Sequence, residues 1–587
     1  MEEVRERGPR LSYRPGLDGL RALAVAGVFI YHARITWLPG GFLGVDLFFV
    51  LSGYLITSLL LVEWDTRHVI DLRRFWLRRA RRLFPAVVVV VLVSLVLAAT
   101  LARDDLTRTR GDALSSIFYY TNWHEIIASH SYFSFVGRPS LLNHLWSLAV
   151  EEQFYVVWPL LLVAGLVLLG RRRFMFVVAA GIAASTTEMW LLYNRSDPSR
   201  VYYGTDTRAS LLLMGILLAL AWPYVERLAH RLLLLELAGL AALVATIVLF
   251  RELQDFDPSL YQGGDLAAAF CFAVLIAAVA HPESTLGRAV GWRPLRWIGE
   301  RSYGIYLWHF PILEVTRPGV DVSWTGPELV VVQAALVVLA AELSYRCVEQ
   351  PIRTGRLQRR LAERPRRRLY ALAAAAVIAA SFGALFATPA PASPIASEFD
   401  RTPLLSFRPG RLPHALEPRK SDAKPPPPPA EPLPAHVYAI GDSVMLGCSS
   451  QLESRLHGHV HVDAIVGRQV EDAVKVLSHR RNHHKLPKAV IVQVGDNGPT
   501  WYSDLVRLRH ALGSVPDVVV VNVRVDRSWE SEVNDALAQF VRTWPQARLA
   551  DWYGSSKDSE LSDGVHPWPY ACTTYARVIA TALLQPH

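Results

Sequence analysis

A serine, a histidine and an aspartate near the C-terminus have the side chains of a nucleophilic site. Ser443 follows a short apolar run, and Asp563 and His566 lie three residues apart further along the chain. Such residues can supply a nucleophile, a general base and the acid that orients the base. The serine is not in a GxSxG elbow, because Met445 occupies the place of the second glycine. The pattern predicts Ser443 as nucleophile, His566 as base and Asp563 as orienting acid.

Two further residues could stabilise the negative charge that develops during acyl transfer. Gly467 follows a strand-like run, 461–466, and Asn497 follows another apolar run in Gly495-Asp496-Asn497. The backbone amides of Ser443 and Gly467 and the carboxamide of Asn497 are suitable donors, and one good donor is worth about 3 kcal/mol. Glycine and asparagine are also ordinary turn residues. Their order with Ser443 and His566 favours an oxyanion hole.

A second group of ionisable residues lies in the apolar N-terminal half. Arg21 and His32 are separated by about three helical turns, so they share one helix face roughly 16 Å apart. Asp46, in the next apolar segment, is expected at the depth of His32 and could orient it. Charged groups in a membrane are costly, which favours a functional site. The alternative is a structural His–Asp hydrogen bond between packed helices.

The chemistry of His32 suits a general base or a transient acyl carrier, because imidazole titrates near neutrality. Glu151 and Glu152 lie in the fourth apolar segment, and Tyr303 and His309 lie in the ninth. We expect these four side chains to support the site around His32 and Asp46.

The composition and the apolar segments around these residues indicate a membrane protein. Hydrophobic residues make up 51% of the chain and charged residues only 19%, and the apolar residues come in blocks of about 20. We predict about ten plus one membrane spans. They are 17–36, 41–62, 83–101, 144–169, 173–192, 208–224, 231–250, 265–281, 303–316, 328–348 and 369–388.

Basic loops predict the orientation of these spans. Residues 64–82 and 346–368 are rich in arginine and should be cytoplasmic, which puts the N-terminus inside. An odd number of spans then places everything after 388 outside the cell. The net charge of +9 comes from clusters beside apolar blocks, so we expect membrane lipid and not nucleic acid as a partner.

The C-terminal part has a different pattern. Five consecutive prolines, Pro425–Pro429, favour a stiff spacer. Runs at Val437–Ile440, Ala489–Val494 and Val518–Val523 are typical of buried parallel strands in an α/β domain. The expected organisation is a cytoplasmic N-terminus at 1–16, a membrane domain at 17–355, a basic segment with the final helix at 356–388, a linker at 389–435 and a catalytic domain at 436–587.

The membrane half resembles the acyltransferase-3 family in several ordered motifs. They are Leu17-Asp18-Gly19-Leu20-Arg21 followed by His32, Gly44–Tyr54, Arg78–Pro85, Glu151–Tyr155, Tyr303–Pro311 and Glu349-Gln350-Pro351. The resemblance implies transfer of an acyl group, commonly acetyl from a cytoplasmic acyl-CoA, to an acceptor outside the cytoplasm. It also makes Arg21 and His32 central. Arg14, Arg21, Arg74, Arg78 and Arg79 could bind the CoA phosphates, or the last three could only anchor the orientation.

The C-terminal half resembles the SGNH hydrolases, in which Ser443, Gly467, Asn497 and His566 match the residues of that name. This resemblance implies a three-layer α/β fold. Asp496 departs from the threonine that is frequent in related transferases. Cys448 and Cys572 are each a few residues beyond the predicted catalytic residues and could form a disulfide outside the cell. No cysteine or histidine spacing predicts a metal site.

The combination resembles enzymes that O-acetylate envelope glycans. We expect an O-acyltransferase, with acyl-CoA as donor and no bound cofactor, that modifies hydroxyls of peptidoglycan or another polysaccharide. One alternative is a membrane-tethered carbohydrate esterase outside the cytoplasm. Another is a transporter or sensor with a ligand-binding external module, which would form no covalent acyl-serine.

Overall fold

Two compact units make up this computed structural model, Met1–Pro389 and Ala390–His587, and each is described by itself. The structure describes residues 12–356, 383 and 434–585, with gaps at 34, 36, 103–105, 129–131, 133–138, 195–197, 229–231, 256, 319–320, 323, 325, 435, 466, 499, 526–528 and 562–564. The last predicted span and nearly all of the proline-rich linker therefore lie outside the described residues.

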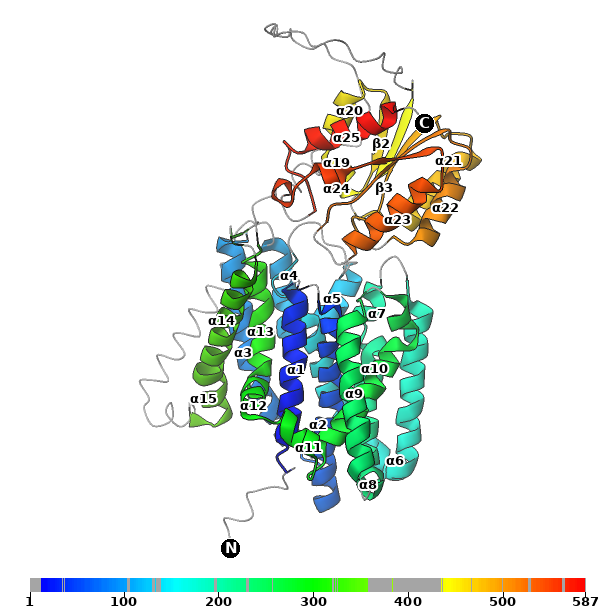
Figure 1. Ribbon diagram of the computed structural model, residues 1–587. Helices are drawn as coiled ribbons and strands as arrows, with labels where there is room; N and C mark the ends of the chain where they lie inside the picture. The colour runs from blue at the N-terminus through cyan, green and yellow to red at the C-terminus, as the bar shows by residue number, and fades with distance from the viewer. Residues whose placement is uncertain are drawn as a thin grey trace. The chain divides into compact units, whose positions relative to one another are not determined.

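The first unit is a helical bundle (Figure 1). Its helices are α1 (Pro15–His32), α2 (Leu43–Arg67), α3 (Leu72–Thr100), α4 (Leu106–Ile117), α5 (Thr121–Ile127), α6 (Leu145–Leu192), α7 (Ser199–Tyr203), α8 (Thr205–Leu228), α9 (Leu232–Glu252), α10 (Asp265–Ala280), α11 (Thr285–Val290), α12 (Arg293–Glu300), α13 (Ser302–Glu314), α14 (Pro327–Ser344) and α15 (Gln350–Arg353). The described residues of the first ten segments predicted to span the membrane lie largely in helices. Two of them, 144–169 and 173–192, form the single element α6, which breaks at Gly170 with φ +70°.

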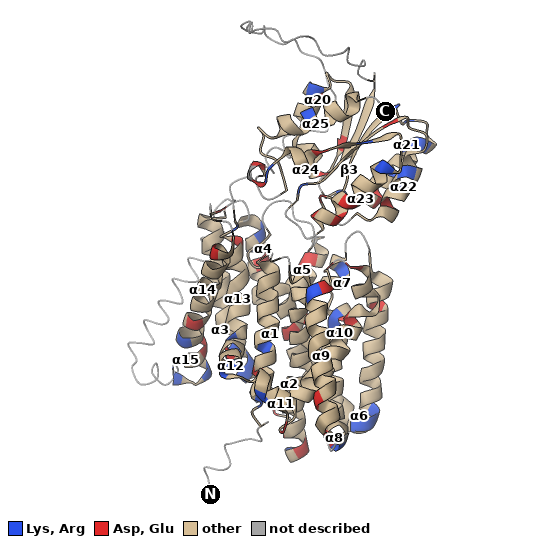
Figure 2. Ribbon diagram, in the orientation of Figure 1, with Lys and Arg blue, Asp and Glu red and all other residues tan. Residues whose placement is uncertain are grey.

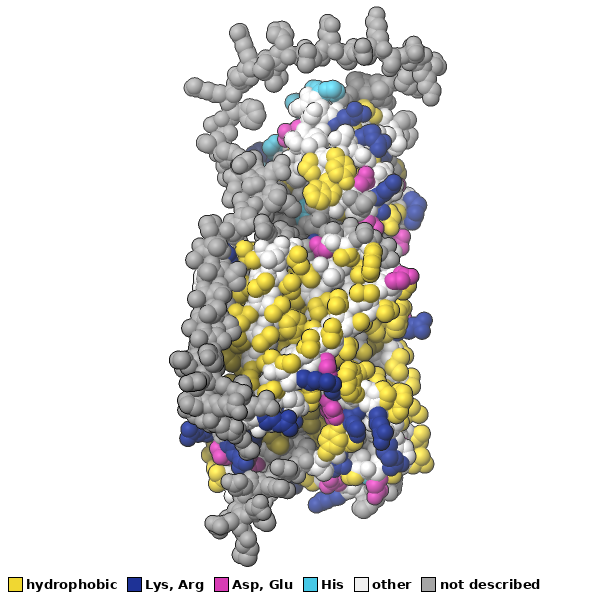
Figure 3. Space-filling view, turned by 90° about the vertical axis from the view of Figure 1, so that its left-hand side faces the viewer, with side chains coloured by type: hydrophobic (Ala, Val, Ile, Leu, Met, Phe, Trp, Pro, Cys, Tyr) yellow, Lys and Arg dark blue, Asp and Glu magenta, His cyan; other side chains and the backbone are white. Residues whose placement is uncertain are grey.

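Seven helical segments among the described residues are long and apolar enough to cross a membrane. Figure 3 shows a broad band of hydrophobic side chains on the surface of the helical unit. On α9, for example, Leu233, Leu237, Leu240 and Val244 are exposed at helical spacing, as expected of a lipid-facing surface. Lys and Arg gather at one end of the unit, at α12, α15 and the ends of α6 and α8 (Figure 2). The unit is a multi-pass membrane domain.

Glycines allow the central helices to approach closely. A Cβ atom on Gly53 of α2 would lie 2.1 Å from the Leu212 carbonyl oxygen, and one on Gly215 of α8 would lie 2.0 Å from the Val50 carbonyl oxygen. Small residues at such crossings let backbones pack where lipid provides no hydrophobic driving force. The α2–α8 contact that results carries several of the buried charges described below.

The second unit is a parallel sheet covered by helices on both faces (Figure 1). Its strands are β1 (Val437–Gly441), β2 (Val460–Ala464), β3 (Ala489–Gln493), β4 (Asp517–Val521) and β5 (Ala547–Ala550), in the order β2-β1-β3-β4-β5. Its helices are α19 (Ser443–Gly447), α20 (Ser449–Arg455), α21 (Val470–Asn482), α22 (Tyr502–Leu512), α23 (Glu530–Arg542), α24 (Trp552–Ser555) and α25 (Cys572–Leu584). The three-layer α/β arrangement agrees with the predicted fold class. Strand β5 was not predicted.

The strand order explains where a site can form. The chain runs outward from β1 to β2, then returns past β1 to β3, so the direction of winding reverses between β1 and β3. In open parallel sheets, ligands bind beyond the carboxyl ends of strands at such a reversal. Ser443 follows β1 and Asn497 follows β3 at this position.

Candidate active site

Ser443 begins helix α19 directly after the turn that follows β1. Asp442 is extended at this turn, and its Oδ1 accepts a hydrogen bond of 3.0 Å from the Val444 amide. Both Asp442 and Ser443 are fully buried. The strand-to-helix turn therefore holds the serine hydroxyl in a fixed position at the end of the sheet.

The base and nucleophile are in contact. His566 Nε2 lies 2.8 Å from Ser443 Oγ, within the range required for proton transfer between a general base and a hydroxyl nucleophile. His566 is held in a segment in which Leu561 pairs with Pro567. The predicted acid, Asp563, lies outside the described residues.

The two predicted oxyanion donors lie in adjacent loops. Gly467 has φ +74° in the turn after β2, a conformation that favours glycine. Gln469 Nε2 donates a 2.9 Å hydrogen bond to the Asn497 carbonyl oxygen, which ties the loops after β2 and β3 together. Asn497 is only 4% exposed, and its Nδ2 makes no hydrogen bond of ordinary geometry within the described part of the chain. A buried donor of this kind suits an oxyanion that forms during the reaction.

A disulfide joins Cys448 to Cys572. Cys448 ends α19, and Cys572 begins α25, six residues after His566. The bond thus connects the segment that follows the serine to the segment that follows the histidine.

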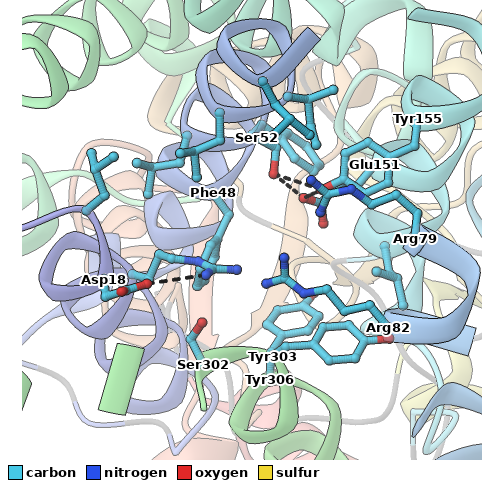
Figure 4. A pocket seen from close by; sticks show the side chains of 18 of the residues that line it. Asp18, Phe48, Ser52, Arg79, Arg82, Glu151, Tyr155, Ser302, Tyr303 and Tyr306 are labelled. Atoms are coloured by element: carbon cyan, nitrogen blue, oxygen red, sulfur yellow. Dashed lines mark hydrogen bonds and ion pairs between the residues drawn. The ribbon is translucent and has the colours of Figure 1, made fainter. Parts of the chain in front are cut away.

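The helical unit contains a cavity of about 310 Å³. Arg14, Arg21, Arg79 and Arg82 line it, and Figure 4 shows Arg79 and Arg82 among the side chains that point into it. Asp18, whose Oδ1 is 3.5 Å from Arg21 Nη1, is also part of the wall. Guanidinium groups are suited to binding phosphate or carboxylate, so four of them around one cavity favour an anionic ligand.

The face of α3 decides which of its arginines reach this cavity. Arg79 and Arg82 are three residues apart and lie on the inner face, whereas Arg74 and Arg78 are exposed and do not line the cavity. The sequence analysis selected Arg74 and Arg78 and omitted Arg82. A helical wheel anchored on the buried Phe75 could have placed Arg79 and Arg82 on its side.

Glu151 lies in the cavity wall within a hydrogen-bonded group (Figure 4). Ser52 Oγ and Tyr155 Oη both donate to Glu151 Oε1, and the Arg79 guanidinium lies 5.2 Å from the centre of the Tyr155 ring. Glu152, the next residue, does not line the cavity. Neither Ser52 nor Tyr155 was among the predicted site residues.

Tyr303 and Tyr306 close another part of the wall (Figure 4). Tyr303 Oη donates a 2.8 Å hydrogen bond to the Leu83 carbonyl, and Tyr306 Oη donates one of 2.8 Å to the His144 carbonyl. Beyond Tyr306 lies a cluster of histidines that does not line the cavity. The cavity and His32 are therefore separate places in the unit.

His309 determines the tautomer of His32. His309 Nδ1 lies 2.5 Å from the Tyr306 carbonyl oxygen and must carry the proton there, so its Nε2 is an acceptor. That Nε2 is 3.2 Å from His32 Nδ1, which is also 3.0 Å from the Val28 carbonyl oxygen. His32 Nδ1 is consequently the protonated nitrogen. The basic nitrogen is Nε2, which faces the Tyr132 hydroxyl at 3.4 Å.

The prediction that Asp46 orients His32 is wrong. Arg208 Nη1 lies 3.2 Å from Asp46 Oδ1 and 3.0 Å from Asp265 Oδ1, and all three side chains are buried. Residue counts gave an expected depth for each side chain, but they could not give the rotation of α2 about its axis. That rotation is set by packing against α8, which carries Arg208.

Comparison with known proteins shows the family of the chain. The family model "Acyltransferase domain" (Acyl_transf_3) matches residues 14–345. The Bacillus subtilis protein YrhL is 36% identical, and the alignment covers 97% of this chain and 98% of the YrhL chain. The peptidoglycan O-acetyltransferase OatA of Listeria monocytogenes is 34% identical over 97% of this chain and 98% of its own. The O-acetyltransferase OatA of Staphylococcus aureus is 33% identical, and the alignment covers 94% of this chain and 93% of the Staphylococcus chain.

Among solved structures, the C-terminal catalytic domain of Streptococcus pneumoniae OatA with a methylsulfonyl adduct is 22% identical, with a TM-score of 0.24. The alignment covers 26% of this chain and 94% of the Streptococcus domain. The chain is a membrane acyltransferase with a C-terminal α/β domain. It belongs to the Acyl_transf_3 family and is an O-acetyltransferase.

Proposed function

We propose that this enzyme takes an acetyl group from cytoplasmic acetyl-CoA, passes it through the helical unit, and transfers it from Ser443 to a hydroxyl of peptidoglycan. The observation that carries the proposal is the 2.8 Å contact between His566 Nε2 and Ser443 Oγ at the end of the sheet. The acceptor class is inferred from the name of the Listeria relative, which matches nearly the whole chain.

Ser443 would act in two steps. In the first, Ser443 Oγ attacks the acyl carbonyl carbon and gives its proton to His566 Nε2, and the leaving group of the donor departs with that proton. In the second, a sugar hydroxyl gives its proton to Nε2 and attacks the acyl-serine, and Ser443 Oγ leaves with the proton. The oxyanion of each tetrahedral intermediate would accept from the amides of Ser443 and Gly467 and from Asn497 Nδ2. Asp563 would orient His566.

The arginine-lined cavity would hold the donor. CoA carries phosphate groups, and Arg14, Arg21, Arg79 and Arg82 offer charge-assisted hydrogen bonds in this cavity. His32 Nε2 would act as the base or transient carrier further along the path. Arg21 lies in the second turn of α1 and His32 is its last residue, so an extended thioester arm would have to reach past Tyr306.

The route requires the two sites to lie on opposite sides of the membrane. The arginine-rich end of the helical unit (Figure 2) would be cytoplasmic, and Ser443 would be outside the cytoplasm. The Cys448–Cys572 disulfide is consistent with an oxidising location for the second unit.

Replacing Ser443 by Ala should abolish O-linked acetate in isolated peptidoglycan while the protein still accumulates in the membrane. Ser450→Ala is the matched control, because Ser450 is exposed seven residues further on and should leave the acetate unchanged. Undiminished acetylation by the Ser443→Ala variant would refute the role of this serine.

A deacetylating esterase would use the same triad, so the acceptor must distinguish the two activities. The full-length protein would be given acetyl donor with and without glycan fragments. A transferase forms O-acetylated glycan and consumes donor faster when acceptor is present. An esterase releases acetate at the same rate in both conditions and removes acetyl groups from the modified glycan.

A further inference from the structure

Two buried carboxyl groups lie directly beside the proposed nucleophile and oxyanion donor. Asp442 precedes Ser443 and is 0% exposed, and Asp496 precedes Asn497 and is 3% exposed. Neither forms a salt bridge with an arginine, lysine or histidine among the described residues, although His566 acts on Asp442 from a greater distance. Burying two such charges beside each other is very costly, so at least one should be neutral.

The hydrogen bonds leave one oxygen of each group unsatisfied. Asp442 Oδ1 accepts from the Val444 amide, and Asp496 Oδ2 accepts a 2.7 Å hydrogen bond from Gln493 Nε2. Asp442 Oδ2 and Asp496 Oδ1 make no hydrogen bond of ordinary geometry within the described residues. The two carboxyl groups lie within hydrogen-bonding reach of each other, and two acceptors can be joined in this way only if a proton lies between them.

The electrostatic surroundings decide which group keeps the proton. Burial, the charge of Asp442 and a hydrogen bond between the two carboxyl groups raise the pKa of Asp496 well above its ordinary value, and the charge of Glu530 on α23 adds to this. Burial also raises the pKa of Asp442, but four influences oppose that shift: the hydrogen bond with Asp496, the hydrogen bond from the Val444 amide, the positive form of His566 and the Asn497 side chain. Asp496 is therefore the acid, and Asp442 is the carboxylate.

We propose that Asp442 and Asp496 hold one proton between them, and that protonated Asp496 is a positioning residue that joins the Ser443 turn to the Asn497 turn. The proposal rests on the proposed role of Ser443. The shared proton bridges the ends of β1 and β3, which carry the nucleophile and the side-chain oxyanion donor. A misplacement of about 1 Å between such groups can cost about a hundredfold in rate.

Other contacts hold the acid in place. Gln493, whose amide donates to Asp496, accepts a hydrogen bond from the Tyr575 hydroxyl of α25. The Trp529 indole donates a 3.1 Å hydrogen bond to the Gly495 carbonyl, which fixes the start of the same turn. These contacts fix the position of Asp496 and satisfy its Oδ2, so that Oδ1 is the oxygen left to interact with Asp442.

The pair should make the enzyme sensitive to alkaline pH. The titratable groups that act on it are His566, Glu530 and Tyr575, and burial followed by the two carboxylates raises the pKa of Tyr575, so that this hydroxyl stays protonated. When Asp496 loses its proton, two adjacent negative charges repel each other. Because the folded-state pKa of Asp496 is raised, the folded state loses stability as pH rises from the unfolded pKa of about 3.9 through the folded value.

Asp496→Asn tests the proton directly. An asparagine carboxamide can donate to Asp442 and accept from Gln493, as the protonated acid does, but it cannot ionise. Asp496→Leu has a similar size and no donor. Asp472→Asn is the control, because it removes the same charge from an exposed position on α21. The readout is the pH profile of kcat and KM for p-nitrophenyl acetate with the full-length protein in detergent, together with the pH dependence of its thermal unfolding.

We expect Asp496→Asn to keep kcat within about twofold at the acidic end of the profile and to lose the alkaline decline attributable to Asp496. We expect Asp496→Leu to lower kcat by about ten- to a hundredfold with little change in KM. Asp472→Asn should follow the unsubstituted enzyme. An alkaline decline that persists unchanged in Asp496→Asn, or an Asn variant as inactive as the Leu variant, would overturn the proposal.

Ser443→Ala separates this outcome from a failure of the proposed function. If that variant still hydrolyses the ester, Ser443 is not the nucleophile and the proposed function fails. If it is inactive and Asp496→Asn keeps the alkaline decline, the serine role stands and only the shared proton is wrong. Folding of each variant is checked by its thermal midpoint.

Discussion

Breaking the Cys448–Cys572 disulfide should destabilise the second unit without removing any catalytic group. The bond closes a chain segment with a sequence separation of 124 residues. Both cysteines are buried, with exposures of 0% and 2%. Replacement of both by Ala frees the segment that follows Ser443 from the segment that follows His566.

The length of the closed segment sets the size of the effect. A cross-link of this length removes chain entropy worth about 5 kcal/mol from the unfolded state, and native disulfides commonly contribute about 2–4 kcal/mol. A domain of this size changes its unfolding midpoint by about 2–4 °C for each kcal/mol. We therefore expect the midpoint of the second unit to fall by about 5–15 °C.

The assay must report on the second unit within the full-length protein. A sulfonyl fluoride that reacts with an activated serine would be added after brief heating to a series of temperatures, and the labelled fraction would be measured. Cys448→Ala and Cys572→Ala alone should each match the double variant, because either one breaks the bond. Cys347→Ala should change nothing, because Cys347 is exposed and free.

At low temperature the double variant should still be labelled, since the 2.8 Å contact between His566 and Ser443 does not use the disulfide. A midpoint unchanged in the double variant would show that this disulfide does not constrain the unfolded chain. A midpoint that fell only in one single variant would show that the effect came from packing of that sulfur and not from the bond.

Three further predictions concern the helical unit. Arg82→Gln should raise the KM for acetyl-CoA by at least about tenfold, because a charge-assisted hydrogen bond contributes about 1.5–3 kcal/mol, whereas Arg78→Gln on the outer face should leave it unchanged. Arg208→Met should lower the thermal stability in detergent by about 3–5 kcal/mol, because it leaves buried carboxylates without a cation, and adding Asp46→Asn should recover part of the loss. Gly53→Val should reduce the yield of monodisperse protein, since even a Cβ there would lie 2.1 Å from a backbone oxygen of α8.

The motifs around Ser443 carried more information than their length implies. A serine after a buried strand, an asparagine after another and a histidine near the chain end were enough to predict one edge of a parallel sheet. The strand ends meet at that edge because parallel strands share a direction. The strands predicted at Ala489–Val494 and Val518–Val523 extended one and two residues beyond the observed ends. Strand β5 was missed because its four residues, Ala547–Ala550, include an arginine and only one large apolar side chain, Leu549.

Asp442 and Asp496 show where motif reasoning stops. Asp496 was noticed only as a departure from threonine, since its partner lies on another strand. Whether a carboxyl group carries a proton depends on its burial and on neighbouring charges, and both are properties of the folded chain.

Helical periodicity also predicted only part of the arrangement in the membrane half. It placed Arg21 and His32 on one helix, but the cavity takes in Arg21 and leaves His32 with His309 and Tyr132. It also detected the arginine cluster of α3 without deciding which of its members face inward. Those choices depend on how each helix is rotated against its neighbours.

By itself, the sequence determined the class of the protein, a multi-pass membrane unit followed by an α/β unit, and the order of the residues around Ser443. The length of an apolar segment and the residues at a strand end are local features, and they can be recognised without knowledge of the packing. Only the tertiary structure decided that Asp46 pairs with Arg208, that Arg82 lines the cavity and that two carboxyl groups meet beside Ser443. Such contacts join residues far apart in the chain, and their geometry is set by the rotation and close approach of whole elements.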